Sequence, residues 1–280
     1  MLAYRHQFHA GNFADVFKHV LLTRMLLALG RKEKPFCYLE THAGIGLYDL
    51  EHAWTQKLGE YHSGVERVWS RRDVPALLEP YTQALSAENP SGTLRWYPGS
   101  PRIARRFLRT EDRAELAELN GHDYETLMRV FAGDRQVRVH HMDGYQALKA
   151  FLPPRERRGL VLVDSSFDRA REYDRLADAL KGAHQRWATG VYALWYPLME
   201  PYAVRGFERR IATSGIRKVL KLELSVLPEG WTDSLRGCAM LIVNPPFGLD
   251  REAAQLLPWL ARVLAEAGCG GSRVDWLVPE

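Results

Sequence analysis

The sequence predicts an α/β fold: a doubly wound, Rossmann-like sheet with a small helical insertion. Short apolar segments of strand type alternate with helical segments along most of the chain, which is typical of a parallel sheet covered by helices. The first strand, residues 36–39, runs into a glycine-rich turn at 43–46, the usual opening of a nucleotide-binding sheet. Residues 50–95 interrupt the alternation with charged helical stretches and several prolines. We therefore predict one domain over residues 1–280, with an inserted helical subdomain over residues 50–95.

The composition is that of a globular protein without a membrane segment. Hydrophobic residues make up 46% of the 280 residues, which is enough for a sizeable core. No run of about 18 apolar residues occurs, and the N-terminus lacks a signal-peptide pattern, so we predict a cytoplasmic protein with no membrane partner. The net charge of +4 permits a nucleic-acid partner without requiring one.

The first helix is predicted over residues 12–29, ahead of the first strand. Asn12 can cap its start and Gly30 can end it. Its apolar residues recur at helical spacing and form one stripe, which predicts an amphipathic helix. Lys18 and His19 fall off that stripe, so they are free to face solvent or a ligand.

Histidine and cysteine residues are the candidates for a metal site. His6, His9 and His19 lie close in sequence, but no cysteine or carboxylate pattern accompanies them. The three cysteines fit neither a disulfide framework nor a paired metal-binding motif. We therefore predict no metal site.

The alternation of strands and helices resumes after the insertion. Strands are predicted over residues 114–119, 137–142, 159–164 and 191–196, then as a late pair over 216–226 and 238–243, and last over 273–278; helices are predicted over 123–131 and 251–268.

Four acidic residues stand at successive strand ends: Glu40, Glu118, Asp143 and Asp164. In an open α/β sheet these ends line one crevice, where ligands bind. Glu40, beside the glycine turn, suits a cationic ligand such as the sulfonium and amino groups of S-adenosylmethionine. Glu118 is placed to accept hydrogen bonds from ribose hydroxyls, and Asp143 is placed to contact an adenine ring.

Two groups of arginines are candidate phosphate contacts. Five arginines between residues 102 and 113 recur at helical spacing, after a helix start with Ser100 as N-cap and Pro101 in the first position. A phosphate backbone can lie along such a stripe. The alternative is a solvated helix face paired with neighbouring acids. The second group is the set of arginines in residues 155–158.

Several long motifs give the chain a resemblance to a known family. They are Tyr4-Arg-His-x-Phe-His-Ala-Gly-Asn12, Ala14-Asp-Val-x-Lys-His19, Thr41-His-Ala-Gly-x-Gly46, Tyr97-Pro-Gly-Ser-Pro101, Asp143-Gly144, Ala188-Thr-Gly-x-Tyr-Ala-Leu-Trp-Tyr-Pro197, Gly215-Ile-Arg-Lys218 and Asn244-Pro-Pro246. With these motifs, which run nearly end to end, the chain resembles the RlmJ family of 23S rRNA adenine-N6-methyltransferases. The resemblance implies a Rossmann-like class I methyltransferase sheet with a small helical insertion, S-adenosylmethionine as the cofactor, and 23S rRNA as the partner.

The resemblance also implies roles for individual residues. Asp164 matches the catalytic position, which also lies against the cofactor. Tyr4 matches a residue that senses the RNA substrate. Lys18 belongs with His6 and His9 to the N-terminal motif near the site, and we assign it with Tyr4 to the RNA substrate. The positions that match cofactor contacts are His19, His42, Ser100, Glu118, Asp143 and Gly144.

The segment Asp164-Ser165-Ser166-Phe167 departs from the family pattern, because amino-directed methyltransferases usually carry Asp/Asn-Pro-Pro-Tyr/Phe here. A carboxylate and a backbone carbonyl accept the two N–H bonds of the adenine amino group and stabilise the charge that develops on it. An aromatic ring stacks on the splayed-out base. Asp164 and Phe167 keep both functions, but the rigidity that proline gives is lost. We therefore expect a working but slower enzyme.

Three alternatives remain at this point. Asn244-Pro-Pro-Phe247 fits the amino-methyltransferase motif as written, but it follows the late strand pair. A non-catalytic protein that binds S-adenosylmethionine or RNA would explain the degraded motif, but not the retained Asp164. A nicotinamide-dependent oxidoreductase would need a third glycine in the turn and an acid about 20 residues later. If RNA is the substrate, we expect a monomer that acts on 23S rRNA in its protein-free or early-assembly form, where bases are accessible.

Overall fold

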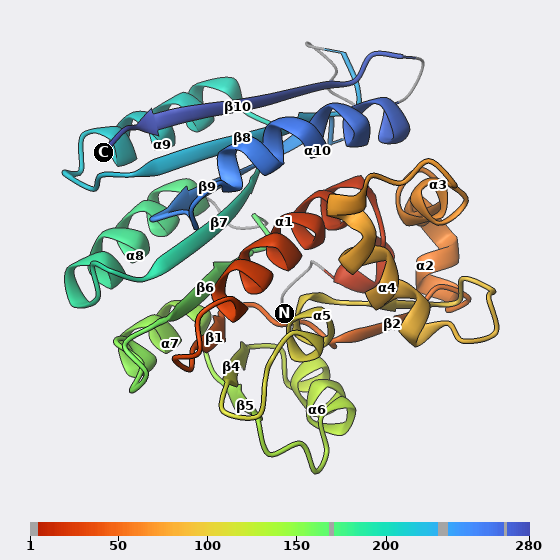
Figure 1. Ribbon diagram of the computed structural model, residues 1–280, viewed down its shortest axis with the longest axis horizontal. Helices are drawn as coiled ribbons and strands as arrows, with labels where there is room; N and C mark the ends of the chain where they lie inside the picture. The colour runs from red at the N-terminus through yellow and green to blue at the C-terminus, as the bar shows by residue number, and fades with distance from the viewer. Residues whose placement is uncertain (1–4, 168–170, 229–234, 266–267) are drawn as a thin grey trace.

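The computed structural model describes residues 5–167, 171–228, 235–265 and 268–280. Its centre is a sheet of eight strands in the order β10-β8-β9-β7-β6-β1-β4-β5 (Figure 1). The strands are β1 (Cys37–Glu40), β4 (Arg113–Glu118), β5 (Val137–His141), β6 (Gly159–Val163), β7 (Val191–Pro197), β8 (Val219–Ser225), β9 (Gly237–Val243) and β10 (Gly271–Val278). The predicted Rossmann-like α/β fold is confirmed, and each strand lies close to its predicted range.

The direction of the strands decides where a ligand can bind. β5, β4, β1, β6 and β7 are mutually parallel, so their carboxyl ends meet at one edge of the sheet. β9 lies antiparallel between β7 and β8, and its last residue, Val243, pairs with Tyr192 near the start of β7. Residues that follow β9 therefore lie at the opposite edge from residues that follow the parallel strands.

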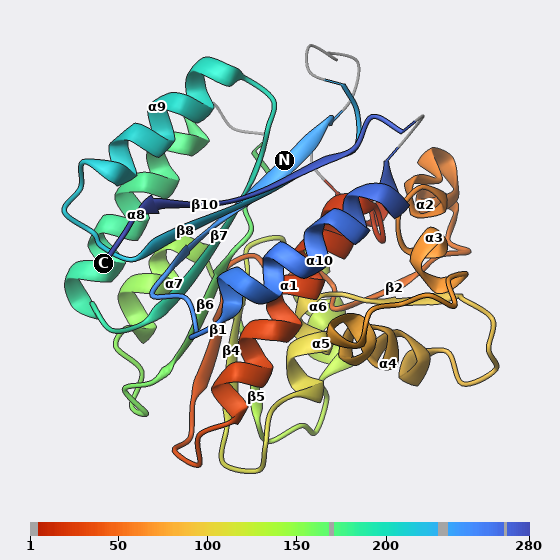
Figure 2. The same ribbon diagram turned by 45° about the horizontal axis from the view of Figure 1, so that its top comes forward.

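Helices cover both faces of the sheet. α1 (Phe13–Gly30) and α10 (Leu249–Leu264) lie side by side on one face (Figure 2), together with α5 (Ser100–Arg106). α7 (Gly144–Phe151), α8 (Glu172–Arg186) and α9 (Pro201–Ala212) cover the other face, and α6 (Gly121–Val130) packs beside β4 and β5. Each face has its own cluster of buried apolar side chains.

The start of α1 is as predicted, but its amphipathic character is not. Asn12 caps the helix and accepts a hydrogen bond from the Asp15 backbone at 2.9 Å. Nearly every side chain of the helix is buried, including those of Lys18 and His19, so the single apolar stripe is wrong. The physical reason is that α4, α5 and α10 enclose α1 against the sheet, so no face remains for solvent.

The segment between β1 and β4 holds short helices at one end of the molecule (Figure 1): α2 (Ala53–Leu58), η2 (Glu60–His62), α3 (Val65–Trp69), η3 (Ala76–Leu78) and α4 (Glu79–Glu88). A separate antiparallel pair, β2 (Leu47–Asp49) with β3 (Trp96–Pro98), joins its two ends. One further short helix, η1 (His6–Phe8), precedes α1. That residues 50–95 form a separate subdomain stays a prediction.

The predicted arginine stripe is wrong. α5 ends at Arg106, so the later arginines of the series lie in a loop and in β4 rather than on one helix. Gly99 is the N-cap of α5 and Ser100 is its first residue, so the helix begins one residue earlier than predicted. Four of the arginines are held by acids rather than being available to phosphate: Arg102 by Glu88, Arg105 by Asp134, Arg109 by Asp112, and Arg113 by Glu156 and Glu115.

Candidate active site

A cavity of about 700 Å³ lies at the carboxyl ends of the parallel strands. Its volume is in the range of sites that hold a cofactor-sized molecule. The sequence-predicted site residues that line it are Lys18, His19, His42, Ser100, Glu118, Asp143, Gly144, Asp164 and Phe167. Tyr4 lies outside the described residues.

Glu118 and Asp143 lie at the ends of β4 and β5. Both carboxylate oxygens of Glu118 accept backbone hydrogen bonds, from Gly44 at 2.8 Å and from Asn120 at 2.7 Å. Burial nevertheless raises the pKa of Glu118. Asp143 caps α7 and accepts hydrogen bonds from the backbone of the first turn. The two acids therefore fix the local backbone as well as facing the cavity.

Gly144 is required by the close approach of α7 to β1. A Cβ atom at this position would lie 2.2 Å from the carbonyl oxygen of Thr41, which no side chain tolerates. Gly144 therefore brings the start of α7 to the cavity wall, next to the glycine-rich turn.

Glu40 does not line the cavity, contrary to the prediction from its place at the strand end. Its side chain is fully buried and accepts hydrogen bonds from the hydroxyls of Tyr38, at 2.8 Å, and Ser100. Burial raises its pKa to about 8, against the opposing effect of these two hydrogen bonds. The prediction failed because the position of Glu40 in its strand determines only where its backbone lies. It does not determine which neighbouring groups its side chain contacts.

Two histidines line the cavity, His19, which is buried, and His42, which is half-buried. The Nδ1 of His19 lies 2.7 Å from the Tyr97 hydroxyl, and the Nδ1 of His42 lies 2.8 Å from Thr41 Oγ1. Burial lowers the pKa of His42 and lowers that of His19 well below its ordinary value. The lowered pKa values favour the neutral imidazole, in which one ring nitrogen donates a hydrogen bond and the other accepts one.

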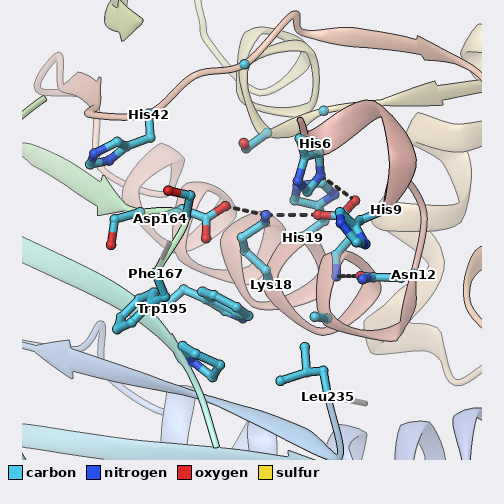
Figure 3. Close-up of a pocket in the computed structure, with 18 of the residues that line it drawn as sticks. His6, His9, Asn12, Lys18, His19, His42, Asp164, Phe167, Trp195 and Leu235 are labelled. Carbon is cyan, nitrogen blue, oxygen red and sulfur yellow. Dashed lines mark hydrogen bonds and ion pairs between the residues drawn. The ribbon is translucent and has the colours of Figure 1, made fainter. Parts of the chain in front are cut away.

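A buried lysine joins two acids at the centre of the site (Figure 3). The Nζ of Lys18 lies 2.9 Å from Asp15 Oδ1 and also donates to Asp164 Oδ2. Burial opposes the charge of Lys18, but the two carboxylates outweigh it and hold its pKa well above the ordinary value. The lysine is only 4% exposed, so it is a bridge within the protein rather than the solvent-facing group that the helical pattern allowed.

The N-terminal histidines pair with acids beside this bridge. His6 Nε2 lies 2.9 Å from Asp15 Oδ2, and His9 Nδ1 lies 3.0 Å from Glu60 Oε1. The hydrogen bond to Glu60 raises the pKa of His9, although burial opposes this. In the part of the chain that the structure describes, no group of His, Cys, Asp or Glu could hold a metal ion.

The segment after β6 carries Asp164 and Phe167 into the cavity. Asp164 is 15% exposed, which leaves its carboxylate accessible to a ligand while Lys18 holds one oxygen. Phe167 has a φ of +52°, an unusual value for an aromatic residue, and its ring lies 4.8 Å from that of Tyr173 and 6.0 Å from that of Trp195. Figure 3 shows Phe167 and Trp195 together on one side of Lys18.

The alternative catalytic motif, Asn244-Pro-Pro-Phe247, lies outside the cavity. It follows β9, whose end is at the opposite edge of the sheet, and it does not line the cavity. The Asn244 amide donates to the carbonyls of Ala188 and Gly190 at 2.8 and 2.9 Å, and Phe247 is 88% exposed. These two hydrogen bonds stabilise the loop that precedes β7. The arginines of residues 155–158 precede β6, so they too lie at the edge away from the cavity.

Some cavity residues were not singled out from the sequence. Glu60 comes from the inserted segment, and Glu172 and Arg175 come from α8. Nothing in their local sequence marks them, because tertiary packing alone brings them to the strand ends. Trp195 lies within one of the long motifs, and that membership was the signal that could have found it.

The residues present fit S-adenosylmethionine. Seven acidic residues line the cavity against two basic ones, Lys18 and Arg175, so the cavity favours a cationic molecule. The acids are Asp15, Glu60, Glu118, Asp123, Asp143, Asp164 and Glu172. A mostly parallel sheet, one antiparallel strand inserted between β7 and β8, and an acid-lined cavity at the parallel strand ends define a class I methyltransferase.

Comparisons with known proteins lead to one family. The family model described as Ribosomal RNA large subunit methyltransferase D, RlmJ, matches residues 33–278. Two proteins named Ribosomal RNA large subunit methyltransferase J are similar over the full length of both chains, one from Escherichia coli (strain K12) at 43% identity and one from Haemophilus influenzae at 41%. The chain therefore belongs to the RlmJ family of ribosomal RNA methyltransferases and is an enzyme that uses S-adenosylmethionine.

Solved structures agree on the fold. Protein LPL1258 from Legionella pneumophila superposes with a TM-score of 0.90 at 37% identity, over 96% of this chain and 98% of that one. A probable spermidine synthase from Corynebacterium glutamicum gives a TM-score of 0.53 at 10% identity, over 96% of this chain and 77% of that one. The second likeness shows the fold alone. None of the described helices has the length and apolar character needed to cross a membrane.

Proposed function

We propose that the protein methylates the N6 amino group of a specific adenine in 23S rRNA. The observation that carries this proposal is the placement of Asp164: its carboxylate is partly exposed in the cavity, is held by Lys18, and lies in the same segment as Phe167. An acid, a backbone carbonyl and an aromatic ring in one short segment match the needs of an adenine amino group. The RNA substrate is supported by the names of the full-length relatives.

Asp164 and the Ser165 backbone carbonyl would accept the two N–H bonds of the adenine amino group. This favours a tetrahedral nitrogen and stabilises the positive charge that develops on it. The Phe167 ring would stack on the base outside its helix. S-adenosylmethionine supplies the methyl group when bound, and the cavity residues would hold it in line with the adenine nitrogen.

The residues proposed to hold the cofactor come from several helices and strand ends that line the cavity. Glu118 would accept from the ribose hydroxyls and Asp143 would lie near the adenine ring. The other proposed cofactor contacts are His19, His42, Ser100, Gly144 and Asp164.

Lys18 would affect the RNA through Asp164 rather than by direct contact, because it is buried between two acids. Its Nζ donates to one carboxylate oxygen of Asp164 and fixes its position, which leaves the other oxygen for the substrate. Tyr4 is proposed to sense the RNA, on the resemblance alone.

The double substitution Ser165→Pro, Ser166→Pro is expected to raise turnover by about two- to five-fold. Each proline at a compatible site stabilises the folded chain by roughly 0.4–1 kcal/mol, mainly by restricting the unfolded chain. Only part of the summed gain applies to the alignment of the segment in the folded enzyme, and a two- to five-fold rate change corresponds to about 0.4–1 kcal/mol. Single-turnover methylation at saturating cofactor measures the effect. Unchanged or lower turnover, in a variant that folds, would argue against lost rigidity as the consequence of Ser165-Ser166.

Protein-free 23S rRNA is expected to be methylated faster than assembled large subunits, because the base must leave its stack to reach the cavity. The test uses labelled S-adenosylmethionine, purified enzyme, and 23S rRNA, 16S rRNA and large subunits as parallel substrates. Label in 23S rRNA alone supports the proposed substrate. Faster methyl transfer to intact subunits would contradict the proposal that the enzyme acts before the subunit is assembled. Label in 16S rRNA would contradict the proposed specificity for 23S rRNA.

A further inference from the structure

A second cavity, of about 320 Å³, opens beside Phe167 between the start of α8 and α9. Figures 1 and 2 show these two helices side by side on one face of the sheet. The second cavity adjoins the active-site cavity, because four residues line both: Phe167, Glu172, Pro197 and Met199. Its volume is at the lower end of small-molecule sites, which suits one nucleotide rather than a longer segment.

The walls of the second cavity combine aromatic and apolar side chains with an arginine. The rings of Tyr173 and Phe207 lie 5.8 Å apart, and the Tyr173 hydroxyl donates to the Pro197 carbonyl at 2.7 Å, so this wall is fixed by the fold. Met199 is 62% exposed and the Arg171 side chain 84% exposed, so both can reach a ligand. A base can pack against ring and thioether surfaces, and a guanidinium group suits a phosphate.

The acids at the second cavity leave room for an RNA strand. The two acids from α8 are paired with arginines, Asp174 with Arg171 and Arg210, and Glu172 with Arg175. Glu200, which precedes α9, is exposed and can accept a hydrogen bond from the amino group of a base. Beside it on α9, the Arg205 guanidinium lies 4.7 Å from the ring of Tyr202, which is 86% exposed. Aromatic and basic groups together are typical of surfaces that bind single-stranded RNA.

Gly206 keeps the second cavity open. It lies in the interior of α9 and lines the cavity. Glycine disfavours a helix interior, because its backbone loses more conformational freedom than that of other residues. Such a glycine often serves close packing, yet a Cβ atom at this position would meet nothing within 4 Å. Packing therefore does not require glycine here, whereas an open cavity does.

We propose that the second cavity binds the nucleotide next to the target adenine in the RNA strand, with its base against Met199 and Tyr173 and its phosphate near Arg171. This inference rests on the proposed function, in which Phe167 stacks on the methylated base. A base held at Phe167 brings the adjoining nucleotide to the second cavity, because the two cavities share that ring. The enzyme then recognises one nucleotide beyond the one that it methylates.

The test fills the second cavity by Gly206→Leu. Filter binding measures the affinity of the full chain for unmodified 23S rRNA, at saturating S-adenosylhomocysteine and about 0.2 M salt, where phosphate contacts contribute less. We expect Gly206→Leu to weaken RNA binding by about tenfold, within the range for loss of one stacked base. The affinity for S-adenosylhomocysteine should not change.

Gly182→Leu is the matched control. Gly182 also lies inside a helix, α8, with nothing within 4 Å of a Cβ atom, but it lines neither cavity. It should bind 23S rRNA as wild type does. Leucine favours a helix more than glycine, so neither substitution should lower the thermal unfolding midpoint.

Ultraviolet crosslinking of wild type to 23S rRNA, with mass spectrometry of the peptide–nucleotide adducts, identifies the contact. We expect adducts within residues 197–207, on the nucleotide beside the methylated one. The inference is overturned if Gly206→Leu binds RNA as wild type does, if both leucine variants weaken binding equally, or if the adducts lie on a nucleotide distant from the methylated one. Failure of the proposed function would appear instead as a different methylated nucleoside from wild type, and the binding comparison would still decide whether the second cavity holds RNA.

Discussion

Asp164→Asn is expected to slow methyl transfer by about 10²- to 10³-fold, the usual effect of removing a group that stabilises charge developing in a transition state. Asparagine keeps the shape of the side chain, but its amide lacks the negative charge that opposes the charge growing on the adenine nitrogen. Lys18 keeps Asp15 as a partner in this variant, so its own charge stays compensated. Single-turnover kinetics with labelled S-adenosylmethionine and 23S rRNA measure the change.

Because Asp164 also lines the cofactor cavity, the affinity for S-adenosylhomocysteine must be measured beside the rate. If the methylation rate of Asp164→Asn stays low at saturating cofactor, the defect lies in methyl transfer and not in cofactor binding. Asn244→Ala is the matched control, since Asn244 lies at the other edge of the sheet and holds only loop carbonyls. Full activity of Asp164→Asn, or loss of activity only in Asn244→Ala, would contradict the assignment.

Lys18→Met is expected to lower the free energy of unfolding by about 3–5 kcal/mol at pH 7, the usual cost of removing one partner of a buried ion pair. Methionine fills much of the space but leaves Asp15 and Asp164 close together without the intervening charge. Urea unfolding measures the loss. Lys181→Met, at an exposed position of α8, is the matched control and should change stability by less than about 0.5 kcal/mol.

The pH dependence of this loss follows from Asp15. Burial alone would raise its pKa, but His6 and Lys18 outweigh burial and hold it well below the ordinary value. A carboxyl of this kind stabilises the fold fully above its unfolded pKa, and the contribution is lost as pH falls through the lowered folded pKa. In wild type the stabilising contribution of Asp15 should therefore persist at mildly acidic pH and be lost only below the ordinary range of aspartate. A wild-type contribution of Asp15, measured against Asp15→Asn, that already disappears near pH 6 would contradict the bridge.

The strand ends could be predicted from the sequence because apolar runs mark buried parallel strands. The positions of Glu118, Asp143 and Asp164 at one edge followed from that pattern alone. Glu40 had the same position in its strand, yet its side chain turned away to Tyr38 and Ser100. The hydrophobic pattern of a strand and the position of a residue within it predict the path of the backbone. The direction of a buried polar side chain depends instead on partners that are distant in sequence.

The burial of Lys18 shows the same limit. Its helical position predicted a residue off the apolar stripe, and helical patterns of this kind assume one solvated face. Packing of α1 by helices on several sides removed that face, and Asp15 and Asp164 then supplied the partners that a buried charge needs. The arginine series failed for a related reason, since helical spacing continued in the sequence after α5 had ended.

The most direct test of the account identifies the nucleoside that the enzyme makes. Unmodified 23S rRNA is incubated with S-adenosylmethionine and either wild type or Asp164→Asn, digested to nucleosides, and analysed by mass spectrometry against methylated standards. The account predicts N6-methyladenosine with wild type and its near absence with the variant. Methylation at another atom or base, or an equal yield of N6-methyladenosine from both proteins, would contradict it.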